Sequence, residues 1–254
     1  MSSSGSGGGG ASGSGGPGQT RAARGRLRLG VLVSGSGTNL QAVLDAIAAG
    51  TLDAEVTLVL SNRPGVQALD RARAAGVAAR VLPHEGLDRS AYDAALVQAL
   101  RDAGVELVVL AGFMRVVTSV LLGAFPDRVL NIHPSLLPAF PGVNAQEQAL
   151  AHGVKVSGCT VHLVVPEVDT GPILVQAAVP VRESDDEARL RARILRQEHR
   201  ILPLAIRLLG EGRVQRVEGS RRLRIDTQGL TVAPAPPTGQ NAEGDDGAAV
   251  VSFG

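Results

Sequence analysis

The chain has 254 residues, of which 25 are basic and 24 acidic, so its net charge is +1. This balance gives no electrostatic reason to expect nucleic acid or an anionic membrane as a partner, and 2% aromatic residues are too few for a base-stacking surface. The single cysteine, Cys159, excludes an internal disulfide and a multi-cysteine metal site. The strongest apolar run, Leu107 to Met114, is too short to cross a bilayer. We therefore expect a cytoplasmic protein.

Low-complexity segments lie at both ends of the chain. Residues 1–25 are rich in Gly and Ser and lack the apolar stretch of a secretory signal, whereas residues 228–254 are rich in Pro, Gly and Ala. Because neither composition buries enough apolar surface to offset the loss of chain entropy, we expect both segments to be disordered. Residues 26–227 have a length that suits one domain.

Apolar strands alternate with amphipathic helices in the first half of this domain. Strands are expected over Leu27–Ser34, Glu55–Leu60, Val77–Leu82, Glu106–Leu110 and Arg128–Ile132. Helices are expected before Gly50 and over Val66–Ala75 and Ser90–Ala103. This alternation predicts an α/β fold with a mostly parallel, Rossmann-like sheet that carries helices on both faces.

The pattern changes after Pro134. The expected elements are a short helix over Ala145–Ala151, an antiparallel pair over Val156–Val165 and Pro172–Val181, a long helix over Asp185–Leu209 interrupted near Pro203, and a hairpin over Arg213–Val217 and Arg221–Ile225. We expect them to form an antiparallel C-terminal part that is appended to the sheet within the same single domain.

The segment Ser34-Gly35-Ser36-Gly37-Thr38-Asn39 connects the first strand to the first helix. Glycines let the backbone approach a ligand, and the first N–H groups of a helix lack helical partners, so the segment is typical of an anion site. The alternative is a plain turn in which Thr38 caps the helix. A dinucleotide fingerprint would need a third glycine, and a Walker loop would need Gly-Lys-Ser/Thr.

Asn131 and His133 stand two residues apart before Pro134. In an extended segment their side chains point the same way, and Pro134 keeps His133 extended. Both should emerge near the carboxyl end of a strand, where ligand sites of open parallel sheets form. An amide and an imidazole there suit an oxyanion and a proton transfer near neutral pH. The alternative is a polar pair that is buried for packing.

Asp169 lies in Val168-Asp169-Thr170-Gly171-Pro172, whose residues are ordinary turn formers. A chemical role requires that this turn fold back beside His133, where the carboxylate would favour the protonated imidazole. From the residues alone, a simple turn remains the alternative.

Five segments follow one another between Arg28 and Leu209: SGSGTNLQA, LAGFMRVV, NIHPSLLPAFPG, GCTVHLV and VDTGPILVQ. Together they resemble the phosphoribosylglycinamide formyltransferases, folate-dependent enzymes of purine synthesis. The resemblance implies that the amine of glycinamide ribonucleotide attacks the formyl carbon of 10-formyltetrahydrofolate, which is a co-substrate, and that no metal takes part. We expect a monomer or a weak homodimer that uses these small molecules.

The resemblance also implies residue roles. Asn131 and His133 would stabilise the oxyanion, His133 would protonate the departing folate nitrogen, and Asp169 would tune His133 and help remove the ammonium proton. The residues implied for glycinamide ribonucleotide are Gly37, Thr38, Asn39 and Glu198. Those implied for the folate are Arg89, Met114, Arg115, Val116, Val117, Asn131, Val165, Pro166, Glu167, Val168 and Asp169.

Some of these residues have plainer interpretations. Glu198 alone is typical of a solvent-facing helix residue, and Met114 of core packing. We expect His162 to be a structural or supporting histidine near the site, and the resemblance implies a cis bond between Leu137 and Pro138. Where related sequences commonly have His, this chain has Gln146, so an acid–base role at that position is out of reach.

Three rival functions are weighed against formyl transfer to glycinamide ribonucleotide. Methionyl-tRNA formyltransferase needs a further RNA-binding domain, and the residues after Leu209 are few and not strongly basic. Formyltetrahydrofolate hydrolase usually carries an N-terminal regulatory domain and needs no phosphate site. A binding module that has lost activity is disfavoured by the presence of Asn131, His133 and Asp169.

Overall fold

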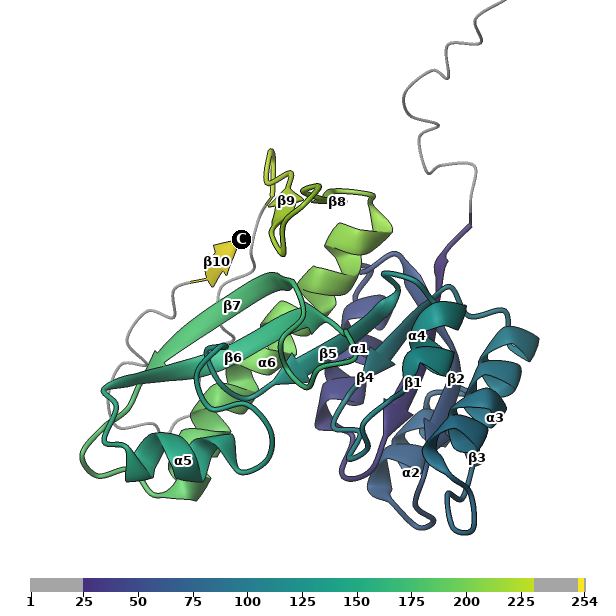
Figure 1. Ribbon diagram of the computed structural model, residues 1–254, viewed down its shortest axis with the longest axis horizontal. Helices are drawn as coiled ribbons and strands as arrows, with labels where there is room; N and C mark the ends of the chain where they lie inside the picture. Colours follow the sequence, from purple (N-terminus) through teal and green to yellow (C-terminus); the bar gives the residue numbers. More distant parts are fainter. Residues whose placement is uncertain (1–24, 231–250, 254) are drawn as a thin grey trace, which may run out of the picture.

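The computed structural model describes residues 25–230 and 251–253, and within these ranges the main sheet has eight strands. In chain order they are β1 (Leu27–Val33), β2 (Ala54–Ser61), β3 (Ala79–Val81), β4 (Leu107–Leu110), β5 (Val129–His133), β6 (Val156–Leu163), β7 (Ile173–Pro180) and β10 (Val251–Phe253). Their spatial order is β10-β7-β6-β5-β4-β1-β2-β3 (Figure 1). A separate hairpin pairs β8 (Val214–Arg216) with β9 (Leu223–Ile225).

The sheet changes character at β5. Strands β1 to β5 pair in parallel, whereas β6 is antiparallel to both β5 and β7. This confirms the mostly parallel α/β sheet with an antiparallel C-terminal part. The chain proceeds outward from β1 to one side and then from β4 to the other, so the topological switch point lies between these two strands. Ligands bind beyond the carboxyl ends of the strands at such a point.

Helices cover both faces of the sheet, as predicted. Within the described residues they are α1 (Thr38–Ala48), α2 (Gln67–Ala74), α3 (Arg89–Asp102), α4 (Ser119–Ala124), α5 (Ala145–Ala151) and α6 (Glu187–Gly210). None of these helices combines the length and the apolar character that a membrane span requires. The short α4 was not expected, because six residues are too few to show a helical period.

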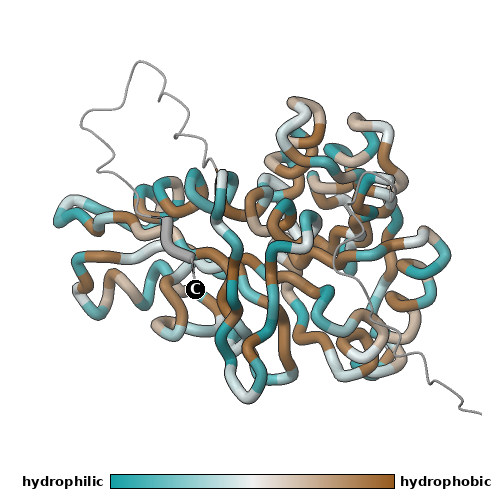
Figure 2. The backbone as a smooth tube through the Cα atoms, turned by 90° about the horizontal axis from the view of Figure 1, so that it is seen from above, coloured by the Kyte–Doolittle hydropathy of each residue, from teal (hydrophilic) through white to brown (hydrophobic). Residues whose placement is uncertain are grey.

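Two hydrophobic clusters separate the layers. Val31 and Leu32 are neighbours in β1 and point to opposite faces of the sheet. Val31 packs in one cluster with Leu40 of α1 and Ile201 of α6, and Leu32 packs in the other with Leu96 of α3. Figure 2 shows hydrophobic stretches of the chain in the middle of the molecule. Because both faces of β1 are buried, the strand is held in place, and so is the start of the turn that follows it.

The expected interruption at Pro203 is wrong, because α6 continues through it. A proline inside a helix costs about 3 kcal/mol through its missing N–H and its ring. On both sides of it, Ile201, Leu202 and Ile206 are completely buried. We infer that this packing holds the helix against the sheet despite the proline.

The expected C-terminal tail, residues 228–254, contains one strand among its described residues. Val251–Phe253 form β10, which pairs antiparallel with β7. Two β-branched or aromatic residues in this triplet favour an extended chain, and the outer edge of β7 offers unpaired backbone groups. Residues 1–24 of the predicted N-terminal extension, and residues 231–250 and 254 of the tail, lie outside the described residues.

A buried ion pair ties the start of α6 to the end of β7. The side chains of Arg193 and Asp185 are 8% and 1% exposed, and their two hydrogen bonds measure 2.6 and 2.9 Å. Arg193 also donates to the carbonyl of Pro180 at 2.9 Å. The hydrogen bond from Arg193 holds the pKa of Asp185 below its ordinary value, against the effect of burial.

Replacing Arg193 by Met should lower the free energy of unfolding by about 3–5 kcal/mol, because it leaves a buried carboxylate without its partner. Urea denaturation at neutral pH measures this loss. The matched control is Arg191→Met, which removes the exposed pair between Arg191 and Glu187 on the same helix and should cost less than about 1 kcal/mol. Equal losses in the two variants would contradict the prediction.

Candidate functional site

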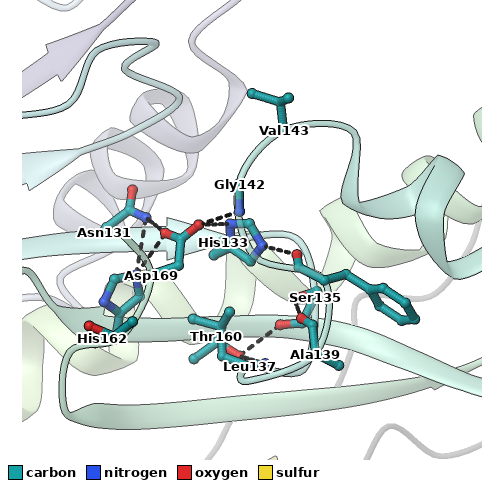
Figure 3. Close-up of polar contacts among 12 residues, drawn as sticks. Asn131, His133, Ser135, Leu137, Ala139, Gly142, Val143, Thr160, His162 and Asp169 are labelled. Atoms are coloured by element: carbon teal, nitrogen blue, oxygen red, sulfur yellow. Dashed lines mark hydrogen bonds and ion pairs between the residues drawn. The ribbon is translucent and has the colours of Figure 1, made fainter. Parts of the chain in front are cut away.

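Three residues from distant parts of the sequence meet at the end of β5. Asn131 and His133 both extend from this strand, and Asp169 comes from the turn between β6 and β7 (Figure 3). His133 Nδ1 lies 3.3 Å from one carboxylate oxygen of Asp169, and the Asn131 amide nitrogen lies 3.4 Å from the other. The proximity that Asp169 requires is therefore present, and the simple-turn interpretation is wrong.

The turn is shaped to bring Asp169 inward. Asp169 adopts a left-handed backbone conformation with φ of 54°, which costs free energy for a residue with a side chain. The N–H of Gly142 donates to its carboxylate at 2.8 Å. A Cβ on Gly171 would lie 1.7 Å from the carbonyl oxygen of Leu163, so only glycine allows the turn to pack this closely.

His162 supports Asn131 from the neighbouring strand, where the two residues face each other in the ladder. Its Nδ1 lies 3.0 Å from the carbonyl oxygen of Leu163, and its Nε2 lies 3.1 Å from the Asn131 amide nitrogen. The same Nε2 also lies 3.6 Å from a carboxylate oxygen of Asp169. His162 therefore contacts both Asn131 and Asp169, at the place where the supporting histidine is expected.

Both ring nitrogens of His133 are engaged by the protein. Its Nε2 lies 2.8 Å from the carbonyl oxygen of Phe140, which can only accept, so this nitrogen carries a proton. Nδ1, which faces Asp169, is the nitrogen that gains or loses a proton. Burial lowers the pKa of His133, and the Phe140 carbonyl and Asp169 oppose this only in part. Asp169 thus favours the charged imidazole, as expected, although burial outweighs its effect on the pKa.

Asp169 is the ionised member of the cluster. Burial alone would raise its pKa, but contacts with His162, the Gly142 N–H and His133 hold the pKa below its ordinary value. A carboxylate beside a neutral imidazole can take up a proton or pass it on. The cluster therefore suits a reaction in which protons move while charge develops on a neighbouring oxygen.

A cavity of about 560 Å³ opens over this cluster, a size typical of a site for a small molecule. Ten of the residues implied for catalysis or the folate line it: Met114, Arg115, Val116, Val117, Asn131, His133, Val165, Pro166, Val168 and Asp169. Met114 is 63% exposed, so its core-packing interpretation is wrong. Arg89, at the start of α3, and Glu167 lie outside this lining.

Three more residues border the cavity. Asn144 before α5 and Arg191 on α6 were missed as site candidates, whereas Gln146 of α5 was singled out in the sequence as a position without an acid–base role. Arg191 precedes Glu198 by seven residues, a spacing that places both on one helix face and was available in the sequence. The described residues contain no group of three or more His, Cys, Asp or Glu side chains arranged to hold a metal ion.

The Gly-rich turn forms a second part of the site. Gly37 precedes α1 with φ of 71° and no side-chain cap, so Thr38 does not cap the helix. A Cβ on Gly37 would lie 2.6 Å from the Cβ of Ala68. The first backbone bond of α1 runs from Gln41 N–H to the Gly37 carbonyl. The preceding N–H groups, without partners in the described chain, can receive an anion.

Asn39 and Glu198 join α1 to α6 beside this turn. The Asn39 amide donates to the Glu198 carboxyl group at 2.7 Å. Glu198 is 7% exposed, so the solvent-facing interpretation is wrong. Burial raises the pKa of Glu198, although the bond from Asn39 opposes this. The buried Oδ1 of Asn39 has no hydrogen-bond partner among the described residues, which leaves an acceptor for a ligand.

Ser34 links the two parts of the site at the switch point. Its N–H donates to the carbonyl of Gly112 at 3.1 Å, and its hydroxyl accepts from the Met114 N–H at 2.8 Å. The same hydroxyl donates to Asn62 at 2.6 Å. The anion turn after β1 and the cavity wall after β4 are therefore held in a fixed relation. The predicted cis bond between Leu137 and Pro138 is also confirmed.

Known proteins are similar to this chain in sequence and fold. A family model described as formyl transferase matches residues 27–206. The chain is 41% identical over 214 residues to phosphoribosylglycinamide formyltransferase of Escherichia coli (strain K12), which covers 84% of this chain and 98% of that protein. The crystal structure of glycinamide ribonucleotide transformylase 1 from Symbiobacterium toebii has a TM-score of 0.77 and 57% identity, covering 79% of this chain and 94% of that one.

A longer relative matches over part of its length. The chain is 49% identical over 185 residues to the trifunctional purine biosynthetic protein adenosine-3 of Drosophila melanogaster. The match covers 72% of this chain. It covers only 14% of the length of that relative.

Replacing Asp169 by Asn should lower the pKa of His133 still further below its ordinary value of about 6.5, because the charge that favours the imidazolium is removed. An NMR titration of the five histidines measures the shift. As a matched control, Asp45→Asn should lower the pKa of His199, which Asp45 raises, and leave His133 unchanged. An unchanged His133 in the Asp169 variant would contradict the assignment.

Proposed function

Because the chain belongs to the formyl transferase family, we propose that it transfers the formyl group of 10-formyltetrahydrofolate to the amine of glycinamide ribonucleotide, a step of purine biosynthesis. The observation that carries this proposal is the meeting of Asn131, His133 and Asp169 beneath the cavity. The enzyme would act in the cytoplasm on these two small molecules, as a monomer or a weak homodimer.

The cavity suits the folate. Its rim carries the apolar side chains of Met114, Val116 and Val168, which are 63%, 44% and 48% exposed. Exposed apolar groups around a concave site favour a flat, largely apolar ligand. The ring system of the folate would cover them, with its formyl group toward Asn131. Arg89, which lies outside the cavity, would contact the part of the folate that projects into solvent.

The α1 terminus suits the ribonucleotide. Backbone N–H groups at Thr38 and Asn39, and the positive end of the helix dipole, would bind its phosphate. Glu198 and the unpartnered Oδ1 of Asn39 are buried acceptors nearby and would receive hydrogen bonds from the ribose hydroxyl groups. The amine would then extend from this turn toward the cavity that Ser34 holds beside it.

The geometry supports an acyl transfer without a covalent enzyme intermediate. The substrate amine forms a C–N bond with the formyl carbon, whose oxygen becomes an oxyanion. The hydrogen bond from the Asn131 amide nitrogen to Asp169 is long, at 3.4 Å, and therefore weak. The amide would donate this hydrogen to the oxyanion instead. Asp169 would accept the ammonium proton, and His133 would deliver a proton to the folate nitrogen as its bond to the formyl carbon breaks.

The rival functions use less of the site. Hydrolysis of formyltetrahydrofolate would need water as the acceptor and would leave the α1 terminus and Glu198 without a role. A module that only binds would not need a carboxylate of lowered pKa beside an imidazole. Transfer to an acceptor that carries a phosphate accounts for both parts of the site.

The His133→Ala variant should turn over about 10²–10⁴-fold more slowly than the wild type, since it lacks the group that relays the proton. Formation of tetrahydrofolate is followed with and without glycinamide ribonucleotide. We expect product only when the acceptor is present. Wild-type turnover in the variant would remove His133 from the mechanism, and equal product without the acceptor would identify a hydrolase.

The Asn39→Asp variant should bind glycinamide ribonucleotide about tenfold or more weakly, because a carboxylate at the start of α1 repels the phosphate. Calorimetry measures this affinity, and the affinity for an unreactive folate analogue serves as the control. We expect the folate affinity to change little. Unchanged affinity for the ribonucleotide would show that its phosphate binds elsewhere.

A further inference from the structure

His133 belongs to a row of three side chains that crosses the antiparallel part of the sheet. In the ladders, His133 of β5 stands opposite Thr160 of β6, and Thr160 stands opposite Gln176 of β7. Residues that are directly opposite in a sheet project from the same face. Thr160 therefore lies between His133 and the outer strand of the hairpin, on the same face as the site.

The hydroxyl group of Thr160 is completely buried and fully used. It donates to the carbonyl of Ser135 at 2.7 Å, and it accepts from the Leu137 N–H at 3.1 Å and from the Gln176 amide at 2.9 Å. A hydroxyl has one proton and two lone pairs, so no capacity is left. The Gln176 amide also donates to the Leu137 carbonyl at 2.9 Å.

These bonds fix the segment that follows His133 (Figure 3). Within it, the Ser135 hydroxyl donates to the carbonyl of Ala139 at 2.5 Å. The chain then returns to the ring of His133, where Phe140 adopts a left-handed conformation with φ of 53°. In this conformation its carbonyl oxygen lies 2.8 Å from Nε2 of His133. The hydroxyl group of one threonine thus supports the carbonyl that sets the protonation of His133.

We propose that Thr160 is a positioning residue for the transfer reaction, because its hydroxyl holds residues 135–140 so that the Phe140 carbonyl keeps a proton on Nε2 of His133. This inference rests on the proposed function. Thr160 does not line the cavity, so it acts on the reaction through His133. The consequence is that Nδ1, beside Asp169, is the nitrogen that exchanges protons during each turnover.

The test is Thr160→Val, which keeps the shape of the side chain and removes its hydrogen bonds. We expect kcat to fall about 10²-fold, as for a misplaced reacting group, with the KM of both substrates within about twofold of the wild type. Nitrogen NMR of His133 at about pH 8, where the ring is neutral, should report the Nε2–H tautomer in the wild type and a mixture of the Nε2–H and Nδ1–H tautomers in the variant. Thr160→Ser should restore both properties.

Ser157→Ala is the matched control. Ser157 lies on the same strand, is 2% exposed, and its hydroxyl has no hydrogen-bond partner among the described residues. This variant should keep the wild-type kcat and the wild-type NMR signature. If it loses as much kcat as Thr160→Val, the effect reflects disturbance of β6 and the proposal is overturned.

The remaining outcomes separate the two proposals. Wild-type kcat and an unchanged proton position in Thr160→Val, with His133→Ala inactive, would overturn the positioning role and leave the proposed function standing. A fully active His133→Ala would instead overturn the proposed function. If Thr160→Val does not fold, Ser135→Ala takes its place, because it removes one bond of the same segment; a smaller change in the same direction is expected, and no change overturns the proposal.

Discussion

The buried carboxylate of Asp169 is the interaction on which the site depends. A buried charge is tolerated only where hydrogen bonds and opposite charges compensate it. Here the contacting groups come from three separate segments. Asn131 of β5 and the Gly142 N–H of the loop after β5 donate hydrogen bonds, and His133 of β5 and His162 of β6 face the carboxylate. Satisfying one carboxylate therefore brings together the strand, the hairpin and the loop that surround the cavity.

This arrangement also explains the unusual backbone around the cavity. Phe140, Asn144 and Asp169 all have positive φ values, a conformation that costs free energy for residues with side chains. At Phe140 it lets the carbonyl reach His133, and at Asp169 it turns the carboxylate inward. Strain is retained where it positions polar groups, and the buried hydrophobic clusters on both faces of the sheet offset its cost.

The parts of the fold that depend on local pattern could be predicted from the sequence. The alternation of strands and helices follows from hydrophobic periodicity, and the shared direction of Asn131 and His133 follows from the twofold repeat of a strand. The burial of Glu198 could not be predicted, because it depends on the packing of α1 against α6. The same holds for β10 and for the continuity of α6 through Pro203, which depend on distant strands.

The site shows the same division between local and distant information. Thr160 carries no local sign of its role, since threonine is common in strands. Its importance arises from the register that sets it between His133 and Gln176. Arg191 reaches the cavity where α6 packs beside α5, although its seven-residue spacing from Glu198 is visible in the sequence.

The lowered pKa of His133 is consistent with its proposed part in the transfer. The reaction releases one proton from the attacking amine and consumes one at the departing folate nitrogen, so the enzyme needs no net proton. An imidazole that begins neutral, with Nε2 occupied, has only Nδ1 to receive a proton. Asp169 is ionised and lies 3.3 Å from that nitrogen. The ammonium proton can therefore pass by way of Asp169 to Nδ1 and then to the leaving group. A permanently charged His133 could not accept this proton, because both of its ring nitrogens would already carry one.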